Sequence, residues 1–413
     1  MLVARELTPS VTAGIVKENI AGIITETGGT TSHSAILARA LEIPAVLSVE
    51  GVASSLKNGD TVVVDGSEGA VIVNPDDNTV SEYSKKRDAF LAERKELENY
   101  RGRETKSASG EVYELFCNIG KPEDAVKAVD ADGEGVGLFR TEFLFMDRTS
   151  IPTEDEQFEA YKKAALILKG KSLIIRTLDI GGDKDIPYLG LEKEENPFMG
   201  FRAIRYCLKN RELFKSQIKA ILRASAFGDI KIMFPLITTM DELREGKKLV
   251  AECKADLRNM GINFNENIQV GVMVETASAA VIADMLAKEA DFFSIGTNDL
   301  TGYTMACDRG NNDVSYLYSP LQPSVLRMIK RTIECGVQNG ISVGMCGEAA
   351  ANKLMIPLLI SFGLTEFSVS APSVLNVRKI ISTWTKEEAD KVTAKVLEMS
   401  TQQEIVEYLK SVV

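Results

Sequence analysis

The sequence predicts an α/β protein in which a small N-terminal domain and a helical linker precede a (β/α)8 TIM barrel. Eight apolar, strand-like runs alternate with helical stretches after residue 110, which is typical of such a barrel. Polar side chains follow most of these runs, and this favours the barrel over an open, doubly wound sheet. The 413 residues also exceed the length of a single small domain.

Residues 1–75 have the pattern of a compact domain of short strands. Short apolar runs alternate there with turns that contain glycine or asparagine. The runs cover residues 1–4, 20–25, 45–49, 61–65 and 70–73. A polar segment that begins with Asn74 and Pro75 then ends the pattern, and we place the end of the first domain there.

A charged helix is predicted over residues 79–103, where Glu, Lys, Arg, Leu and Ala dominate. A solvated helix of this kind can connect two domains and permit their relative motion. We therefore assign residues 76–104 to a helical linker and residues 105–413 to the barrel. The predicted barrel strands cover residues 112–119, 135–140, 172–178, 230–236, 269–274, 292–296, 342–345 and 366–370.

His33 is the only histidine of the sequence, and it stands at the start of a helix predicted over residues 34–41, after the turn Gly28-Gly29. The free N–H groups and the dipole at a helix N-terminus favour an anion, so a phosphorylated imidazole would be stabilised there. The alternative is a capping segment followed by a histidine that only packs. The local pattern leaves both interpretations open.

Polar side chains follow five of the eight predicted strands and would converge on one mouth of the barrel. Arg140, Arg176 and Arg202 offer guanidinium donors for phosphate oxygens. Glu275 and Asp299 offer hard oxygen ligands of the kind that Mg²⁺ prefers. Together they indicate a site for a small polyanion and a metal ion, whereas each residue alone could equally form a buried ion pair.

Cys346 follows the seventh predicted strand and is open to two interpretations. Most cysteines at such positions are small apolar fillers, but a thiol over a phosphate site could transfer a proton. The six cysteines lie far apart in the sequence, so neither disulfides nor a zinc site is predicted.

The net charge of −11 argues against a nucleic-acid partner. No run of eighteen apolar residues and no signal-peptide pattern occurs. We therefore predict a cytoplasmic protein without membrane insertion.

Long segments of the sequence resemble enzyme I of the bacterial phosphoenolpyruvate-dependent sugar phosphotransferase system. The resemblance covers essentially the whole chain, and its segments occur in the family's order. They include GGTTSHSAILAR (28–39), GLFRTEFL (137–144), RTLDIGGDK (176–184), NPFMGFR (196–202), FFSIGTNDLT (292–301) and GMCGE (344–348).

The resemblance implies a role for each candidate residue. His33 becomes the phosphohistidine, with Thr12 as its hydrogen-bond partner, and Cys346 is the acid that protonates the enolate carbon. The phosphate-binding positions are Arg140, Arg176, Lys184, Arg202 and Asn298, and Arg309 binds the substrate carboxylate. Glu275 and Asp299 are the ligands of Mg²⁺, which Mn²⁺ can replace.

The same resemblance implies that the protein transfers the phosphoryl group of phosphoenolpyruvate to His33 and releases pyruvate, as the first step of sugar uptake. The phosphate would then pass to the phosphocarrier protein HPr. A homodimer through the barrel is expected, and the histidine domain would swing about the linker between the barrel mouth and HPr.

Members of this family begin with a longer N-terminal part that docks HPr, so we expect the first domain to be truncated and HPr to bind weakly. One alternative is a phosphoenolpyruvate-binding dimerisation or regulatory fragment that transfers no phosphate to HPr. The other is a relative of pyruvate phosphate dikinase or phosphoenolpyruvate synthase, which would need a nucleotide-binding domain.

Overall fold

The computed structural model describes the chain except for residues 8–18, 29–37, 39–42, 147 and 182–185. The chain forms two compact units, Met1–Glu96 and Leu97–Val413. The first contains the short N-terminal strands, and the second contains the barrel.

The N-terminal unit contains a parallel sheet of order β1-β2-β3 and an antiparallel hairpin of β4 and β5. Its elements are β1 (Leu2–Ala4), β2 (Ile23–Thr25), β3 (Ala45–Val46), α3 (Val52–Ser55), β4 (Val62–Asp65), β5 (Ala70–Val73) and α4 (Asp77–Leu97). Each of the five strands lies within one of the apolar runs that predict it. The helix predicted over residues 34–41 falls, apart from Ala38, outside the described residues.

Helix α4 has no buried residue, as a solvated connector should. It ends at Leu97, however, earlier than the predicted limit of residue 103. A short 3₁₀ turn, η2 (Glu98–Tyr100), follows it, and Gly102 then adopts a φ of 71°. This left-handed conformation suits glycine and interrupts a helix.

Arg378 anchors the segment that follows α4 to the barrel unit. Its side chain is 2% exposed, and it donates to Thr105 Oγ1 and to the carbonyl oxygens of Tyr100 and Asp132 at 2.9, 3.1 and 2.9 Å. Its Nη1 also pairs with the Asp132 carboxylate. A buried charge is stable only with such partners. The bonds from Arg378 to Tyr100 and Thr105 therefore fix this segment to the barrel unit.

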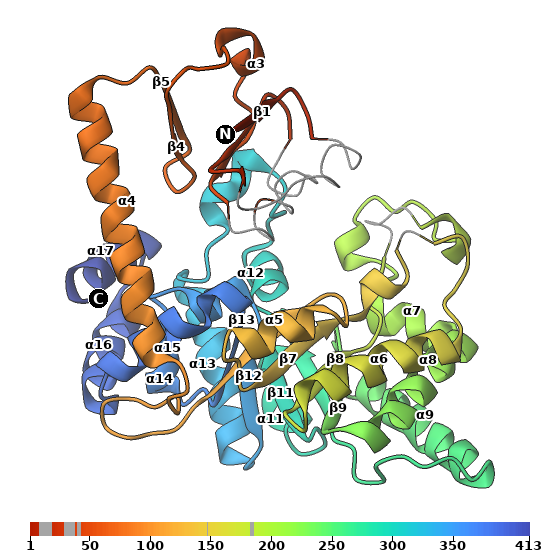
Figure 1. Cartoon of the computed structure of the whole chain (residues 1–413). Coiled ribbons are helices and arrows are strands. Elements are labelled where there is room, and N and C mark those ends of the chain that lie inside the picture. Colours follow the sequence, from red (N-terminus) through yellow and green to blue (C-terminus); the bar gives the residue numbers. More distant parts are fainter. Residues whose placement is uncertain (8–18, 29–37, 39–42, 147, 182–185) are drawn as a thin grey trace. The chain divides into compact units, whose positions relative to one another are not determined.

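Eight parallel strands form the predicted closed barrel (Figure 1). The strands are β6 (Glu114–Ile119), β7 (Gly135–Arg140), β8 (Leu173–Arg176), β9 (Ile230–Phe234), β10 (Val270–Val274), β11 (Phe292–Ile295), β12 (Ser342–Met345) and β13 (Glu366–Val369). Pairing of β13 with β6 closes the barrel, and Asn118 and Ser368 reinforce it with a side-chain hydrogen bond of 2.7 Å. Each observed strand lies within its predicted run, so the barrel prediction is confirmed.

Helices occupy the connections between the strands. They are α5 (Asp124–Asp130), α6 (Glu154–Leu168), α7 (Ala203–Lys209), α8 (Arg211–Ala224), α9 (Met240–Asn259), α10 (Ala277–Val281), α11 (Ala283–Leu286), α12 (Thr297–Met305), α13 (Pro323–Gln338) and α14 (Ile356–Phe362), followed by α15 (Val374–Thr383), α16 (Lys386–Glu398) and α17 (Gln402–Val412). Threonines in capping boxes begin α6, α9, α16 and α17. Short 3₁₀ turns lie at Thr141–Leu144, Pro187–Leu189, Pro197–Met199, Ser225–Phe227, Asn312–Leu317, Glu348–Ala351 and Ala371–Ser373.

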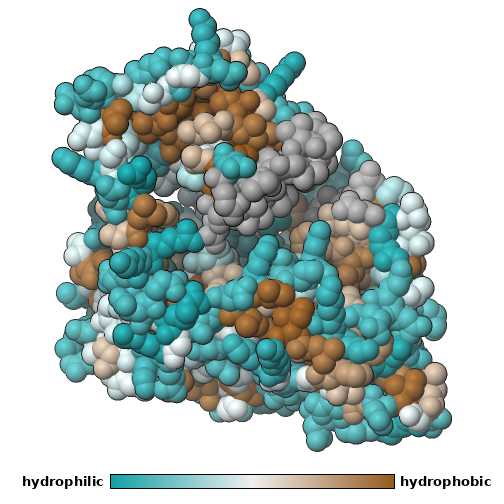
Figure 2. Space-filling model, viewed as in Figure 1, coloured by the Kyte–Doolittle hydropathy of each residue, from teal (hydrophilic) through white to brown (hydrophobic). Residues whose placement is uncertain are grey.

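Two apolar cores hold the barrel together. The larger one lies between the strands and the helices and contains, for example, Phe139, Ile175 and Phe234. A separate cluster fills the inside of the barrel with side chains that alternate with these along the strands. It consists of Leu138, Ile174, Met233, Met273, Phe292 and Cys346. On the face of the barrel unit seen in Figure 2, hydrophilic residues predominate and apolar ones form separate patches.

All six cysteines are free, and all but Cys307 are buried. In the described part of the chain, no helix has both the length and the apolar character needed to cross a bilayer.

Glu366 is a carboxyl group buried inside the barrel. It is 5% exposed, and its Oε1 has no hydrogen-bond partner in the described structure. Burial is the main cause that raises the pKa of Glu366 from 4.5 to about 8, and the neighbouring carboxylate of Glu114 adds to the increase. The positive charge of Lys231 acts in the opposite direction. Between these two pKa values, Glu366 is therefore protonated in the folded protein and ionised in the unfolded chain.

We predict that Glu366→Gln makes the protein more stable than the wild type by a margin that grows with pH. The unfolded chain binds fewer protons than the folded one between the two pKa values, so wild-type stability falls there by up to about 1.4 kcal/mol per pH unit. Glutamine has the shape of the protonated acid and removes this loss. Denaturant unfolding at about pH 5, 6 and 7 measures the margin, and exposed Glu212→Gln should show none. A constant margin across this range would contradict the prediction.

Candidate functional site

The strand ends bring candidate residues together at one mouth of the barrel. Arg140 and Arg176 are the last residues of β7 and β8, and Glu275 and Cys346 directly follow β10 and β12. Asp299 lies in the first turn of α12, which follows β11. Since carboxyl ends of parallel strands share one end of a closed barrel, these side chains face a common region.

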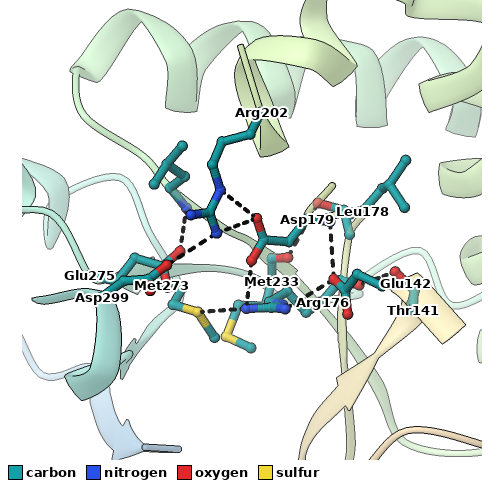
Figure 3. A network of polar contacts seen from close by, with 12 residues as sticks. Thr141, Glu142, Arg176, Leu178, Asp179, Arg202, Met233, Met273, Glu275 and Asp299 are labelled. Atoms are coloured by element: carbon teal, nitrogen blue, oxygen red, sulfur yellow. Dashed lines mark hydrogen bonds and ion pairs between the residues drawn. The ribbon is translucent and has the colours of Figure 1, made fainter. Parts of the chain in front are cut away.

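Asp179 is the centre of a buried ion-pair network in this mouth. Figure 3 shows its carboxylate between the guanidinium groups of Arg176 and Arg202. Arg176 Nη1 lies 3.0 Å from Asp179 Oδ2, and Arg202 Nη2 lies 2.8 Å from Asp179 Oδ1. Arg202 Nη2 also lies 3.1 Å from Asp299 Oδ2. A single carboxylate thus fixes two arginines that come from different segments of the chain.

Glu142 completes the charge balance around Arg176. Its Oε1 lies 3.0 Å from Arg176 Nη2 and accepts the backbone N–H of Asp179 at 3.1 Å. The backbone around Arg176 is held as well, because Thr141 Oγ1 donates to the Arg176 carbonyl oxygen at 2.9 Å. Burial lowers the pKa of Arg176, but Glu142 and Asp179 outweigh this effect and raise the pKa above its usual range.

Glu275 is fully enclosed and carries no ion pair among the described residues. Its Oε1 accepts the backbone N–H of Leu236 at 2.7 Å. A side chain on Gly296 would come within 2.7 Å of Glu275 Oε2, so glycine is needed there to admit the carboxylate. Burial, together with the nearby carboxylates of Asp299 and Asp179, raises the pKa of Glu275 to about 8.

Asp179, Glu275 and Asp299 could hold a divalent cation. Each offers one carboxylate oxygen, and these oxygens lie within 4.8 Å of one another. Hard oxygen donors at this spacing suit Mg²⁺ or another hard cation. Burial is the main cause of the raised pKa of Glu275, and the carboxylates of Asp299 and Asp179 add to it. A bound cation would offset the negative charge of these three groups. The three residues therefore fit a metal site.

Arg140 lies beside this network without a carboxylate partner. Among the described residues, its guanidinium forms neither a hydrogen bond nor an ion pair. Burial and the positive charge of Arg176 lower the pKa of Arg140. Its donors are therefore available to an anion that enters the mouth.

Cys346 faces the same interior. The residue is 4% exposed, and its Sγ lies 3.7 Å from the Ile295 carbonyl oxygen. Burial raises the pKa of the thiol to about 11, so it is protonated at neutral pH. A group in that state can donate a proton but is a poor nucleophile.

Arg309 and Asn298 lie near the network but outside its ion pairs. The guanidinium carbon of Arg309 is 5.6 Å from the centroid of the Phe198 ring, and that of Arg202 is 5.7 Å from the same centroid. Asn298 stands in the first turn of α12 beside Asp299, where its carbonyl oxygen accepts the Tyr318 hydroxyl at 2.9 Å.

Three predicted site residues, His33, Thr12 and Lys184, lie outside the described residues. The structure thus brings together Arg176, Arg202, Glu275 and Asp299, with Arg140 and Cys346 beside them. The sequence analysis did not single out Asp179, Glu142 or Phe198 for a role. Asp179 could have been found, because it stands three residues after Arg176 at the same strand end.

Comparison with known proteins defines the class of this chain. Residues 94–385 match the PEP-binding domain of the PEP-utilising enzymes, and residues 1–69 match the mobile domain of the same enzymes. The first match covers the greater part of the chain, including the barrel-mouth residues from Arg140 to Cys346. The chain therefore belongs to the PEP-utilising enzymes.

Within this class, the similar proteins identify the particular family. The phosphoenolpyruvate-protein phosphotransferase of Bacillus subtilis is 51% identical over 99% of this chain and 72% of its own length. That of Staphylococcus carnosus is 47% identical over the same shares. The chain belongs to the phosphoenolpyruvate-protein phosphotransferases, a family of enzymes, and the resemblance seen in the sequence motifs is confirmed.

One solved structure shares sequence with part of the chain. The solution structure of an Enzyme I protein (nEIt) is 54% identical and covers 22% of this chain and 36% of that one. Its TM-score is 0.21.

We predict that Glu275→Gln weakens divalent-cation binding by about ten-fold or more, because it replaces a charged ligand while keeping an acceptor for the Leu236 N–H. Asp179→Asn should weaken binding similarly and also destabilise the fold by about 3 kcal/mol, since it removes the shared partner of two buried arginines. Titration with Mn²⁺, followed by paramagnetic resonance of the free ion, measures the affinity.

The matched control is Asp256→Asn, which removes a carboxylate that pairs with Lys219 on the protein surface. It should leave Mn²⁺ affinity unchanged and stability nearly unchanged, because exposed ion pairs contribute little. Equal affinities for Glu275→Gln and wild type would rule out Glu275 as a ligand.

Proposed function

We propose that this protein transfers the phosphoryl group of phosphoenolpyruvate to His33 and releases pyruvate. The main support is the barrel mouth, where a buried carboxylate cluster lies beside the guanidinium of Arg140, which has no partner among the described residues. The chain also belongs to this enzyme family. His33 is the only histidine of the sequence, so it is the only histidine there that could accept the phosphoryl group.

The substrate would be held mainly by positively charged side chains, some for its phosphate and one for its carboxylate. Arg140, Arg176 and Arg202 would bind the phosphate, helped by Lys184 and Asn298, and Arg309 would bind the carboxylate. Arg176 and Arg202 already have carboxylate partners, so they act as fixed, preorganised donors. Arg140 has none and would gain its counter-ion from the substrate.

Asp179, Glu275 and Asp299 would hold Mg²⁺ or Mn²⁺. When bound, the ion neutralises negative charge on the phosphoryl oxygens and so assists transfer. The protein's part is to keep the three carboxylates within reach of the phosphate. The buried ion pairs of Asp179 serve that purpose, because they prevent its side chain from rotating away.

The imidazole of His33 would attack phosphorus in line with the leaving oxygen. A P–N bond forms, the P–O bond to the enolate breaks, and the enolate oxygen keeps the electron pair. The Cys346 thiol would then give its proton to the terminal carbon of the enolate, which completes pyruvate. The high pKa of this thiol ensures that the proton is present at neutral pH.

Domain motion and partners are also part of the proposal. Residues 1–75 would carry His33 to and from the barrel of residues 105–413, with residues 76–104 as the linker. HPr would accept the phosphate, and two barrels would form a homodimer. We place the reaction in the cytoplasm, because six free cysteines suit a reducing compartment.

Intact-mass analysis after mixing the protein with phosphoenolpyruvate and Mg²⁺ tests the proposal directly. We expect an adduct of about 80 Da that acid removes, as phosphoryl transfer to a histidine nitrogen requires. The adduct should be absent from His33→Ala. Binding of phosphoenolpyruvate with neither adduct nor pyruvate would identify a binding fragment and reject the enzymatic proposal.

We predict that Cys346→Ala slows pyruvate formation by about a hundred-fold or more, the usual contribution of a positioned general acid. Binding of phosphoenolpyruvate should change little, since the thiol acts after phosphoryl transfer. Lactate dehydrogenase coupled to pyruvate release measures the rate.

Cys117→Ala is the control for this substitution. Cys117 is likewise buried, and burial raises its pKa to about 12, but it lies in the outer core, away from the mouth. Its loss should leave the rate of pyruvate formation nearly unchanged. A similar rate for both variants would show that Cys346 is an apolar filler.

A further inference from the structure

The aromatic ring of Phe198 lies near two cations of the barrel mouth. The guanidinium carbons of Arg202 and Arg309 lie 5.7 and 5.6 Å from its centroid. Both distances fall within the range of about 6 Å over which the ring's quadrupole attracts a cation. Two positive groups that would repel each other thus share one aromatic partner.

Phe198 is held in place by its backbone. It lies in the 3₁₀ turn η5 (Pro197–Met199), and its carbonyl oxygen accepts a hydrogen bond from the Tyr303 hydroxyl of α12. The adjoining chain is fixed by the Glu194 carboxylate, which accepts the backbone N–H of Phe201 at 2.9 and 3.1 Å. The backbone of Phe198 is therefore tied to the same helix that presents Asp299.

The two arginines depend on this ring to different degrees. Arg202 is buried and is held by Asp179, Asp299 and Tyr303 through distances of 2.8 to 3.4 Å. Arg309 is exposed, and in the described structure its guanidinium forms no hydrogen bond or ion pair. Loss of the ring would leave Arg202 in position and would release Arg309.

We propose that Phe198 is a positioning residue that sets the spacing between Arg202 and Arg309. It thereby favours ligands that carry a carboxylate next to the carbon that bears the phosphate ester. The inference rests on the proposed function, in which Arg202 binds the phosphate and Arg309 binds the carboxylate. In this role Phe198 acts through the two arginines.

Calorimetric titration with two small ligands in the presence of Mg²⁺ tests this role. Phosphoglycolate carries both a phosphate and a carboxylate, whereas inorganic phosphate carries only the former. In Phe198→Leu, phosphoglycolate should bind about two- to five-fold more weakly, the scale of a lost cation–π contact at an exposed cation. Inorganic phosphate should bind as in the wild type, and Phe198→Tyr, which keeps the ring, should restore phosphoglycolate affinity.

A double-mutant cycle with Arg309→Met separates positioning from general support of the loop. If Phe198 acts through Arg309, Phe198→Leu has no further effect on phosphoglycolate in the Arg309→Met background. Equal weakening of both ligands, or an undiminished effect in that background, would overturn the proposal. Unchanged phosphoglycolate binding in Phe198→Leu would overturn it as well.

The binding assay is independent of phosphoryl transfer to His33. Absence of the phosphohistidine adduct would reject the proposed function and leave the ligand comparison valid. Conversely, the adduct could form while each ligand binds Phe198→Leu as tightly as it binds the wild type. That result would reject only the role of Phe198.

Discussion

The carboxylate of Asp179, buried between Arg176 and Arg202, is the interaction on which the barrel mouth depends. Charged groups out of water are stable only when they are paired, and Asp179 compensates both guanidinium groups while remaining within reach of Glu275 and Asp299. One side chain therefore belongs to the cation network and to the acidic cluster at once. This dual role places the groups suited to a phosphate beside the groups suited to a divalent cation.

The barrel supplies the rigidity that such a network requires. Apolar side chains fill its interior below the mouth, and the pairing of β13 with β6 closes the ring of strands. Arg378 then extends this rigid unit to the segment that follows α4, whereas α4 itself has no buried residue. The segment after α4 is therefore held to the barrel unit by buried contacts, whereas α4 is exposed along its length.

Periodicity in the sequence was sufficient to find the eight barrel strands, because strands buried on both faces form continuous apolar runs bounded by turns. The strand-end rule likewise identified Arg176, Glu275 and Asp299, since a barrel gathers such residues at one mouth. The end of α4 was misplaced, because the charged composition continues to Arg103 while the helix stops before Gly102. The roles of all the candidate site residues stay predictions, and those of His33, Thr12 and Lys184 concern positions outside the described residues.

The sequence by itself determined the fold class, the strand positions and the family, because these depend on local patterns and on long matching motifs. Only the tertiary structure decided that Asp179 joins two arginines and two other acids, and that Phe198 lies beside both Arg202 and Arg309. Asp179, Phe198 and Arg202 lie in the long connection after β8, whereas Glu275 follows β10 and both Asp299 and Arg309 follow β11. No local pattern states which of these residues meet. Their meeting depends on the closure of the barrel and on the packing of the loops over its mouth.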